Sequence, residues 1–493
     1  MAPHVCIPSS AHLWPIGELG NPQKGSAIPP VSELTDRPDL HQIWARTWEV
    51  IPSPTLTGRR GVATAVSARG LDWLFARSGG RIKLGLDRVQ ALLRALGNPH
   101  LDMPTLVIGG SNGKGSVATL CASALSAGGA KTGLFTSPHV LDFGERVRID
   151  GHPLPLDRVE HFLARAAPQI EETEATFFEA TTALAFCAFR DAGVDLAVLE
   201  VGLGGRLDAT NVTLPLGAAI TSIDLEHTGI LGDDRLLIAS EKFPIARAGR
   251  PLVVGPVEPE VADWFHRSAS NDGVELHLIE EDWSWRVRSQ SETGLRADLA
   301  GPGIELTDLT IELLGRHQAA NSALACALLQ RADLWPGESA VRQGFADLDL
   351  PGRFDIVQTR PVPVVIDVAH NSPGVAASVA TWRELWGDEP IAIVFSALRD
   401  KDLDAMCAEL LPLAGRIYVP ELDARRGRPP APVADLLRRA GADAQQCGSV
   451  AEALDGALGL VETGRARGVL CLGSFHVAEG AYRVSRWGAS ARL

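Results

Sequence analysis

Cysteine pairs, a surplus of basic residues and long apolar runs are all missing from this 493-residue sequence. Its seven cysteines are scattered, and an odd, widely spaced set argues against a disulfide framework or a zinc knuckle. The net charge of −14 disfavours a general nucleic-acid binder. No apolar run reaches the roughly 18 residues of a membrane span, and no secretory signal is visible at the N-terminus. We therefore expect a cytoplasmic protein with neither a membrane nor a nucleic-acid partner.

The composition is that of a globular protein with two or three domains, since 45% of the residues are hydrophobic and 22% are charged. Residues 1–68 are rich in Pro, Ser and Gly, and we interpret them as an irregular N-terminal extension. We expect a central domain over residues 69–350, with a β-rich part at about 256–314 that alternates as half-exposed strands do. Pro351-Gly352 marks the start of a C-terminal domain over residues 351–493.

Apolar runs alternate with helical patterns in both domains, which predicts an α/β fold with mostly parallel, helix-covered sheets. Ligands in open α/β sheets bind beyond the carboxyl ends of the strands. We therefore expect the reaction site in a cleft between the two domains. The predicted strands are Thr105–Ile108, Thr132–Phe135, Leu196–Leu199, Ala218–Ile223, Pro251–Val254, Val364–Asp367, Ile391–Phe395, Arg416–Val419 and Val469–Leu472.

The segment from Thr105 to Ser116 has the layout of a phosphate-binding loop: a short apolar strand, a glycine-rich turn, then Lys114 and a helix. Backbone N–H groups at the start of a helix attract anions, and Lys114 would reach the terminal phosphates of ATP. The match to the general P-loop pattern is imperfect, because Gly115 separates Lys114 from Ser116. An ordinary glycine-rich turn is the alternative.

Four further residues stand after predicted strands or in loops, and each has a structural alternative. Glu200 ends a strand, so its carboxylate can bind magnesium or cap a helix. Ser137 can be a metal or phosphate ligand, or a turn residue. His227 can bind a metal or be simply solvated. Lys242 can be carbamylated if burial removes its proton, or can form an ion pair with little effect on stability.

Polar residues also gather near the expected domain junction, where each alone is weak evidence. Arg353 can hold a phosphate, and Asn321 can contact adenine. Asp367 can bind a ribose or orient a substrate amine.

Taken in order, these segments resemble the folylpolyglutamate synthase and dihydrofolate synthase family of the Mur ligase superfamily. The resemblance runs from about Leu71 to Arg483. It rests on the segments IKLGLDRVQALLRALGNP, GGSNGKGS, TSPH, FGERVRIDG, FFEATTALAF, LEVGLGGRLDATN, EHTGILG, EKFPI, GRHQAAN, PGRFD, DVAHN and FSALRDKD.

The resemblance implies an N-terminal P-loop-type ATPase domain, a Rossmann-like C-terminal domain, and a role for each matching residue. ATP contacts would be Asn112, Gly113, Lys114, Gly115, Ser116, Asn321, Arg353 and Asp367. The ligands of two Mg²⁺ ions would be Ser116, Ser137, Glu200, His227 and a carbamylated Lys242. Residues near the pteridine substrate would be Phe178, Glu179, Leu207, Asp208 and Ala209. Residues acting in catalysis would be Lys114, His227, Lys242 and His370.

Four positions depart from the family pattern. Ser111 stands where Thr is typical, and Glu226 where Asp is typical. Phe243-Pro244 replace small residues after Lys242, which puts the carbamate in doubt. Val368 replaces the usual glycine.

The activity implied is an ATP-dependent ligation of L-glutamate to dihydropteroate, to a folate polyglutamate, or to both, by a monomer. Two alternatives remain open from the sequence. One is another amino-acid ligase of the superfamily, against which the folate-type segments argue. The other is a nucleotide-binding regulator without ligase activity, against which the presence of Lys114, Glu200, His227 and Lys242 argues.

Overall fold

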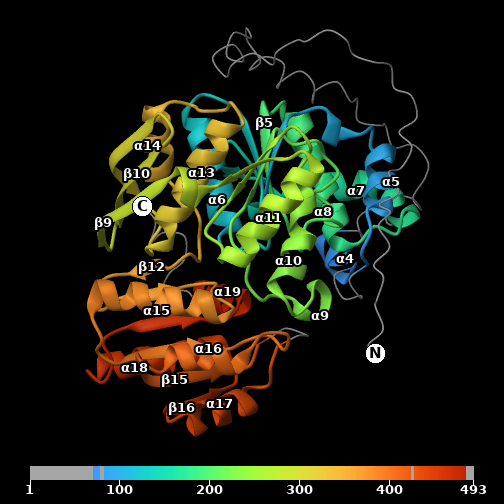
Figure 1. Ribbon diagram of the computed structural model, residues 1–493. Helices are drawn as coiled ribbons and strands as arrows, with labels where there is room; N and C mark the ends of the chain where they lie inside the picture. Colours follow the sequence, from blue (N-terminus) through green and yellow to red (C-terminus); the bar gives the residue numbers. More distant parts are fainter. Residues whose placement is uncertain (1–69, 78–82, 423–426, 485–493) are drawn as a thin grey trace, which may run out of the picture.

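A computed structural model of the chain describes residues 70–77, 83–422 and 427–484 (Figure 1). The predicted extension over residues 1–68 lies outside the described residues. Among the helices in the described ranges, none combines the length and the apolar character needed to cross a membrane.

The larger sheet has eight strands, and its central strands are buried on both faces. All five residues of each of the two central strands are buried, which explains why the sequence shows continuous apolar runs there. Neighbouring strands pair in parallel, except in the first two pairs of the spatial order, which are antiparallel. That order is β4 (His152–Pro153), β3 (Val147–Ile149), β2 (Thr132–Phe135), β5 (Leu196–Glu200), β1 (Thr105–Gly109), β6 (Gly217–Ile220), β7 (Pro251–Val254) and β8 (Glu275–Leu278).

Helices cover both faces of this sheet, and β1 alternates between the two cores. Leu106 and Ile108 pack in one core with α6 (Lys114–Ala127), α13 (His317–Arg331) and α14 (Glu338–Ala346). Val107 packs in the other core. The helices of that second core are α4 (Leu71–Ala76), α5 (Asp87–Ala95), α7 (Leu156–Glu172), α8 (Phe177–Ala192), α9 (Thr228–Leu231), α10 (Arg235–Lys242) and α11 (Pro259–Asp272).

A small antiparallel sheet covers α13 and α14 on the side away from the large sheet (Figure 1). Its strands are β9 (Ser284–Ser291), β10 (Gly294–Gly301) and β11 (Ile304–Ile311). It is shorter than the β-rich stretch expected at about 256–314, because that stretch begins with α11, and β8 then pairs in parallel with β7. A short helix, α12 (Ile279–Asp282), leads into β9.

The second, six-stranded sheet is also parallel except for one edge strand. Its spatial order is β12 (Asp355–Gln358), β13 (Val364–Ile366), β17 (Val469–Leu472), β14 (Ile391–Phe395), β15 (Ala414–Pro420) and β16 (Ala444–Cys447). The edge strand β12 is antiparallel to β13. The helices that cover it are α15 (Ser372–Trp386), α16 (Leu403–Leu410) and α17 (Pro430–Arg439) on one face, with α18 (Val450–Glu462) and α19 (Phe475–Arg483) on the other.

The two sheet systems are in contact at several places. The buried Val140, which follows β2, packs in the core formed by α18, α19 and Val368. Away from there, Trp386 Nε1 donates to Glu292 at 2.8 Å, and Arg316 pairs with Glu384 at 2.8 Å. The loops after β1, β2, β5 and β6 therefore share one edge of the large sheet and face the second one (Figure 1).

Candidate active site

The loop from Gly110 to Gly113, called the phosphate loop below, joins β1 to α6. Gly110 and Gly113 have φ values of +134° and +84°, which residues with a Cβ rarely adopt. A Cβ on Gly113 would also lie 2.8 Å from Asn321 Oδ1. Glycine is therefore required at Gly113 for two reasons, and Asn321, a predicted ATP contact, lies directly against the loop. The first turn of α6 presents unpaired N–H groups to whatever the loop holds.

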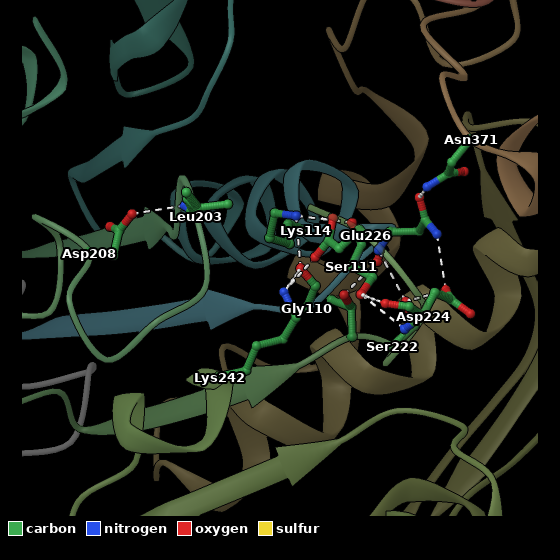
Figure 2. Close-up of polar contacts among 12 residues, drawn as sticks. Gly110, Ser111, Lys114, Leu203, Asp208, Ser222, Asp224, Glu226, Lys242 and Asn371 are labelled. Atoms are coloured by element: carbon green, nitrogen blue, oxygen red, sulfur yellow. Dashed lines mark hydrogen bonds and ion pairs between the residues drawn. The ribbon is translucent and has the colours of Figure 1, made fainter. Parts of the chain in front are cut away.

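Lys114 is the first residue of α6, and its side chain folds back over the phosphate loop. Lys114 Nζ donates to Gly110 O at 2.8 Å and to Ser111 O at 3.0 Å (Figure 2). A phosphate in the loop can take over these donors, because the ammonium group lies at the loop rather than in solvent. The predicted role of Lys114 is compatible with this placement.

Side chains from the loop after β6 hold the phosphate loop in place. Asn112 Nδ2 donates to Asp224 at 3.0 Å, and its backbone N–H donates to Ser222 Oγ at 3.0 Å. Ser111 Oγ donates to the backbone carbonyl of Asp224 and accepts from its N–H (Figure 2). Serine at this position therefore keeps the hydrogen bonding that a threonine hydroxyl would supply.

Glu200 lies at the end of β5 and is buried, with 4% of its surface exposed. Its carboxylate accepts the backbone N–H of Ser137 at 2.9 Å and forms no ion pair within the described ranges. Burial raises its pKa, and Lys114, the Ser137 N–H group, Arg353 and Arg146 oppose this shift. These three cations lie near Glu200 without touching it, which leaves room beside the carboxylate.

The room beside Glu200 fits a divalent cation that also binds phosphate oxygens. A cavity of about 20 Å³ lies between Gly115, Glu200 and Arg353, enough for about one water-sized ligand. In the part of the chain that the structure describes, no three acidic, His or Cys side chains converge as a complete metal site. Hydrated Mg²⁺ typically takes one or two carboxylates and completes its shell with water and nucleotide phosphates. Ser116, which is 2% exposed, and Ser137, whose backbone N–H meets Glu200, carry the hydroxyl groups that were predicted as further ligands.

Lys242 and Glu226 form a buried ion pair beneath the phosphate loop. Lys242 Nζ donates to Glu226 Oε1 at 2.6 Å and to Gly110 O at 2.9 Å, and only 1% of Lys242 is exposed (Figure 2). Burial lowers the pKa of Lys242, whereas Glu226 raises it. Burial would raise the pKa of Glu226, but Lys114 and Lys242 hold it at about 2. Glutamate, one methylene longer than the usual aspartate, reaches the ammonium group directly.

His227 follows Glu226 in the left-handed region, with φ of +45°, and forms the N-cap of α9. Burial and the nearby Lys401 lower its pKa to about 4. The imidazole is therefore neutral at pH 7 and retains a lone pair for a metal. Its Nδ1 lies 4.0 Å from Asp400 of the second sheet system, which places His227 at the junction.

The residues predicted near the pteridine fall into two groups. Phe178 packs over Gly202, where a Cβ would lie 2.4 Å from its ring, so it forms a wall beside the loop after Glu200. The Glu179 carboxylate accepts the Thr176 N–H at 2.7 Å and forms an ion pair with Arg88 at 3.0 Å. Asp208 accepts from the N–H groups of Leu203 and Thr210 and from the Thr210 hydroxyl, so it shapes the loop that carries Leu207 and Ala209 (Figure 2).

The predicted residues of the second sheet system lie at the same junction. Arg353 stands over the ring of Phe475 and would lie 3.3 Å from a Cβ on Gly115. Asp367 is buried and accepts from Ser378 Oγ at 2.6 Å and from Ala369 N, so it orders the loop that follows β13. His370 Nδ1 lies 3.0 Å from Val368 O, which makes Nδ1 the donor and leaves Nε2 as an acceptor.

No role was predicted for Arg146, Asp224 or Asn371, although Asn371 belongs to the DVAHN segment expected near the domain junction. Asn371 Nδ2 donates to Asn112 Oδ1 at 2.8 Å, and Arg146 is a buried cation near Glu200. No local signal pointed to Arg146, because its burial and its position near Glu200 appear only in the fold. None existed for the contact between Asn112 and Asn371, which depends on the docking of the two sheets.

A second cavity, of about 560 Å³, lies elsewhere. It is lined by α7, the end of α8 and the β3–β4 hairpin, at the opposite end of β2 from Ser137. Its position separates it from the phosphate loop.

Two family models match the chain. The Mur ligase middle domain matches residues 108–329, and the Mur ligase glutamate ligase domain matches residues 352–475.

Curated relatives cover most of the chain at about one third identity. The dihydrofolate synthase/folylpolyglutamate synthase of Escherichia coli is 34% identical over 395 residues, which are 80% of this chain and 90% of the relative. A probable bifunctional folylpolyglutamate synthase/dihydropteroate synthase of Haloferax volcanii is 35% identical over 83% of this chain. The chain spans about half, 49%, of that relative's length.

Solved structures show the same architecture. E. coli FolC in complex with DHPP and ADP has a TM-score of 0.75 at 32% identity, covering 86% of this chain and 97% of that one. A Yersinia pestis folylpolyglutamate synthase/dihydrofolate synthase with Mn, AMPPNP and L-glutamate bound has a TM-score of 0.73 at 31% identity, covering 86% and 98%. The α/β fold predicted from the sequence is confirmed.

Proposed function

Because this chain belongs to the folylpolyglutamate synthase and dihydrofolate synthase family, within the Mur ligase superfamily, we propose that it is an ATP-dependent, ADP-forming ligase. It would join L-glutamate to dihydropteroate, to the γ-carboxylate of a folate polyglutamate, or to both. The relatives that share its architecture were crystallised with ADP, DHPP or glutamate, which supports these substrate classes.

One observation carries the proposal: the Glu200 carboxylate stands at a strand end beside the phosphate loop, inside a ring of cations that do not touch it. Lys114 comes from the phosphate loop and Arg353 from the domain junction. Such an arrangement can concentrate ATP phosphates, a divalent cation and an anionic acceptor at one point. Residues 69–350 would hold ATP, and residues 351–493 would close over it.

The first step activates a carboxylate, which by itself resists attack by an amine. An oxygen of the acceptor carboxylate attacks the γ-phosphorus of ATP, the bond to the β-phosphate oxygen breaks, and ADP leaves with that electron pair. Lys114 and the N–H groups of α6 would neutralise charge on the transferring group, with Arg353 on its other side. The product is an acyl phosphate and ADP.

In the second step the amine of glutamate attacks the acyl carbon. A tetrahedral intermediate forms, inorganic phosphate leaves with the electron pair of its C–O bond, and the amine loses a proton. His370 Nε2, left as an acceptor by the bond of Nδ1 to Val368, is suited to orient the ammonium group of glutamate. Docking of the second domain would keep water from the acyl phosphate.

Magnesium is the cation we propose, held by Ser116, Ser137, Glu200 and His227 together with phosphate oxygens. When bound, it supplies charge neutralisation at the phosphates. We assign no carbamate to Lys242. A carbamate requires a neutral amine, whereas Glu226 at 2.6 Å stabilises the ammonium form and would repel a second anion.

Product analysis tests the proposal. Purified protein with ATP, Mg²⁺ and L-glutamate receives either dihydropteroate or tetrahydrofolate, and ADP release is measured alongside the mass of the pteridine product. We expect ADP release that requires both glutamate and a pteridine, with a product heavier by one glutamyl residue. The pteridine that supports turnover identifies the activity. ADP release that depends on neither glutamate nor the pteridine would contradict the ligase assignment.

A further inference from the structure

Arg146 is a buried arginine whose terminal donors are unused. It ends the short 3-10 helix Phe143–Arg146 that leads into β3, and it is 7% exposed. Its Nε donates to His139 Nδ1 at 2.7 Å. Within the described residues its two terminal nitrogens make no hydrogen bond. Buried guanidinium groups normally satisfy their donors, so these nitrogens are free for a ligand.

Aromatic rings surround the Arg146 guanidinium on one side. Its carbon lies 5.1 Å from the centre of the Phe177 ring and 5.8 Å from that of Phe143. Phe75 stacks on Phe177 at 5.4 Å, so the three rings form a wall. Ring faces attract a cation but accept no strong hydrogen bonds, and the wall keeps the group poorly solvated. An anion held here would gain from the low local polarity.

The backbone fixes Arg146 beside the reaction site. Thr136 N donates to Arg146 O at 3.0 Å, and the next residue, Ser137, holds the Glu200 carboxylate. Burial lowers the pKa of Arg146 to about 10, against attraction from Glu200 and Glu145, so the group remains charged at pH 7. It is near enough to Glu200 to be attracted, yet it forms no ion pair with it. The charge of Arg146 therefore lies beside the reaction site without being neutralised by Glu200.

The other charged side chains near the site already have partners or another ligand. Lys114 and Arg353 face the phosphate side, and the carboxylates of Glu179 and Asp208 are engaged within the protein. The acceptor substrate needs a cation that holds its carboxylate while its aromatic part lies against an apolar surface. Arg146 with its aromatic wall offers this combination.

We propose that Arg146 binds the carboxylate of the pteridine acceptor and holds it beside Glu200 for phosphorylation, an inference that rests on the proposed function. The acceptor is thus recognised as an aryl or glutamyl carboxylate by a bidentate guanidinium. His139, fixed through its Nδ1, orients the guanidinium and is a positioning residue.

A comparison of two ligands distinguishes loss of the proposed contact between Arg146 and the carboxylate from damage to the fold. Calorimetric titration with EDTA and ADP present compares pteroate with its neutral carboxamide in the wild type, Arg146→Gln and Arg146→Lys. We expect the wild type to prefer the acid by roughly 10- to 100-fold. Arg146→Gln should lose that preference, and Arg146→Lys should keep part of it. Damage to the fold would weaken both ligands equally.

Arg190→Gln is the control, because it removes an arginine at the end of α8, away from the phosphate loop. Arg190 pairs with Asp191 at 2.9 Å and donates to Leu96 O at 3.1 Å. It should alter stability and leave the preference for the acid unchanged. A preference that survives in Arg146→Gln, or that is missing from the wild type, overturns the inference. A wild type that binds neither ligand overturns the proposed function instead.

Discussion

Asn371 donates its side-chain amide to Asn112 Oδ1 at 2.8 Å and thereby joins the start of α15 to the phosphate loop. Both amides are oriented by further bonds. Asn371 Oδ1 accepts from Gly374 N at 2.9 Å as the N-cap of α15, and Asn112 Nδ2 donates to Asp224. The contact therefore has a defined direction, and it couples the position of the second domain to the conformation of the phosphate loop.

Replacing Asn371 should weaken that coupling while α15 stays intact. Asn371→Ser keeps a good N-cap but removes the amide donor, and we expect kcat/KM for ATP to fall about 3- to 10-fold. Asn371→Asp also keeps the cap but sets a carboxylate against Asn112 Oδ1, and we expect a larger fall. Steady-state kinetics measure both effects.

The thermal unfolding midpoint of the two Asn371 variants serves as the control. Both should unfold close to the wild-type temperature, because serine and aspartate cap helices about as well as asparagine. Equal kcat/KM values for the wild type and Asn371→Asp would show that the contact has no part in turnover.

Lys114→Ala should abolish glutamate-dependent ADP release, with a fall of at least about 100-fold in kcat. The ammonium group is the charge that would follow the transferring phosphoryl group, and alanine leaves only the loop N–H groups. The fold should persist, because among the described residues Lys114 Nζ bonds only to two loop carbonyls. A far-UV spectrum and an unfolding curve check the fold, and undiminished turnover would remove the phosphate loop from the mechanism.

The sequence predicted the inner parallel strands of both sheets because their apolar runs are continuous, as in β7 and β14, whose bounds were predicted as observed. It missed the parallel edge strands β8 and β16, which are partly exposed. It placed the β-rich part too early, since the apolar pattern of α11 was overlooked. The antiparallel edge strand β12 has no fully buried residue and gives no apolar run to detect.

The site residues that belong to a local sequence motif could be predicted. Those whose role depends on how the two domains dock could not. The glycines of the phosphate loop and Glu200 at a strand end have a local signature. The contact between Asn112 and Asn371 joins elements that meet only in the fold, and the burial of Arg146 near Glu200 also appears only there. Lys242 was singled out for its chemistry, but its partner Glu226 was noticed only as a departure from the family pattern.

Removal of the Glu226 charge should make the free energy of unfolding less dependent on pH in the acid range. The pKa of Glu226 is about 2 in the folded protein and near 4.5 when unperturbed. Its ionised form therefore stabilises the fold fully above about pH 4.5, and this stabilisation disappears as the pH falls through about 2. Between pH 5 and pH 2 the wild type should lose up to about 3 kcal/mol more free energy of unfolding than Glu226→Gln.

Urea unfolding at pH 7, 5, 4 and 3 measures this difference. Glu160→Gln, which changes an exposed acid of α7, is the control and should follow the wild-type curve. Parallel curves for the wild type and Glu226→Gln would mean that the ion pair with Lys242 adds nothing to the acid sensitivity of the fold.

The same ion pair makes a prediction about carbamylation of Lys242. Burial lowers the pKa of Lys242, and Glu226 is the group that opposes this most strongly. Glu226→Gln should therefore release a neutral, nucleophilic amine, which forms a carbamate with dissolved carbon dioxide. With ¹³C-labelled bicarbonate, we expect a carbamate carbon resonance in Glu226→Gln, none in the wild type, and none in Glu226→Gln combined with Lys242→Arg. A stoichiometric carbamate in the wild type would contradict this prediction. It would mean that Glu226 does not keep Lys242 protonated and that the carbamate replaces the ion pair.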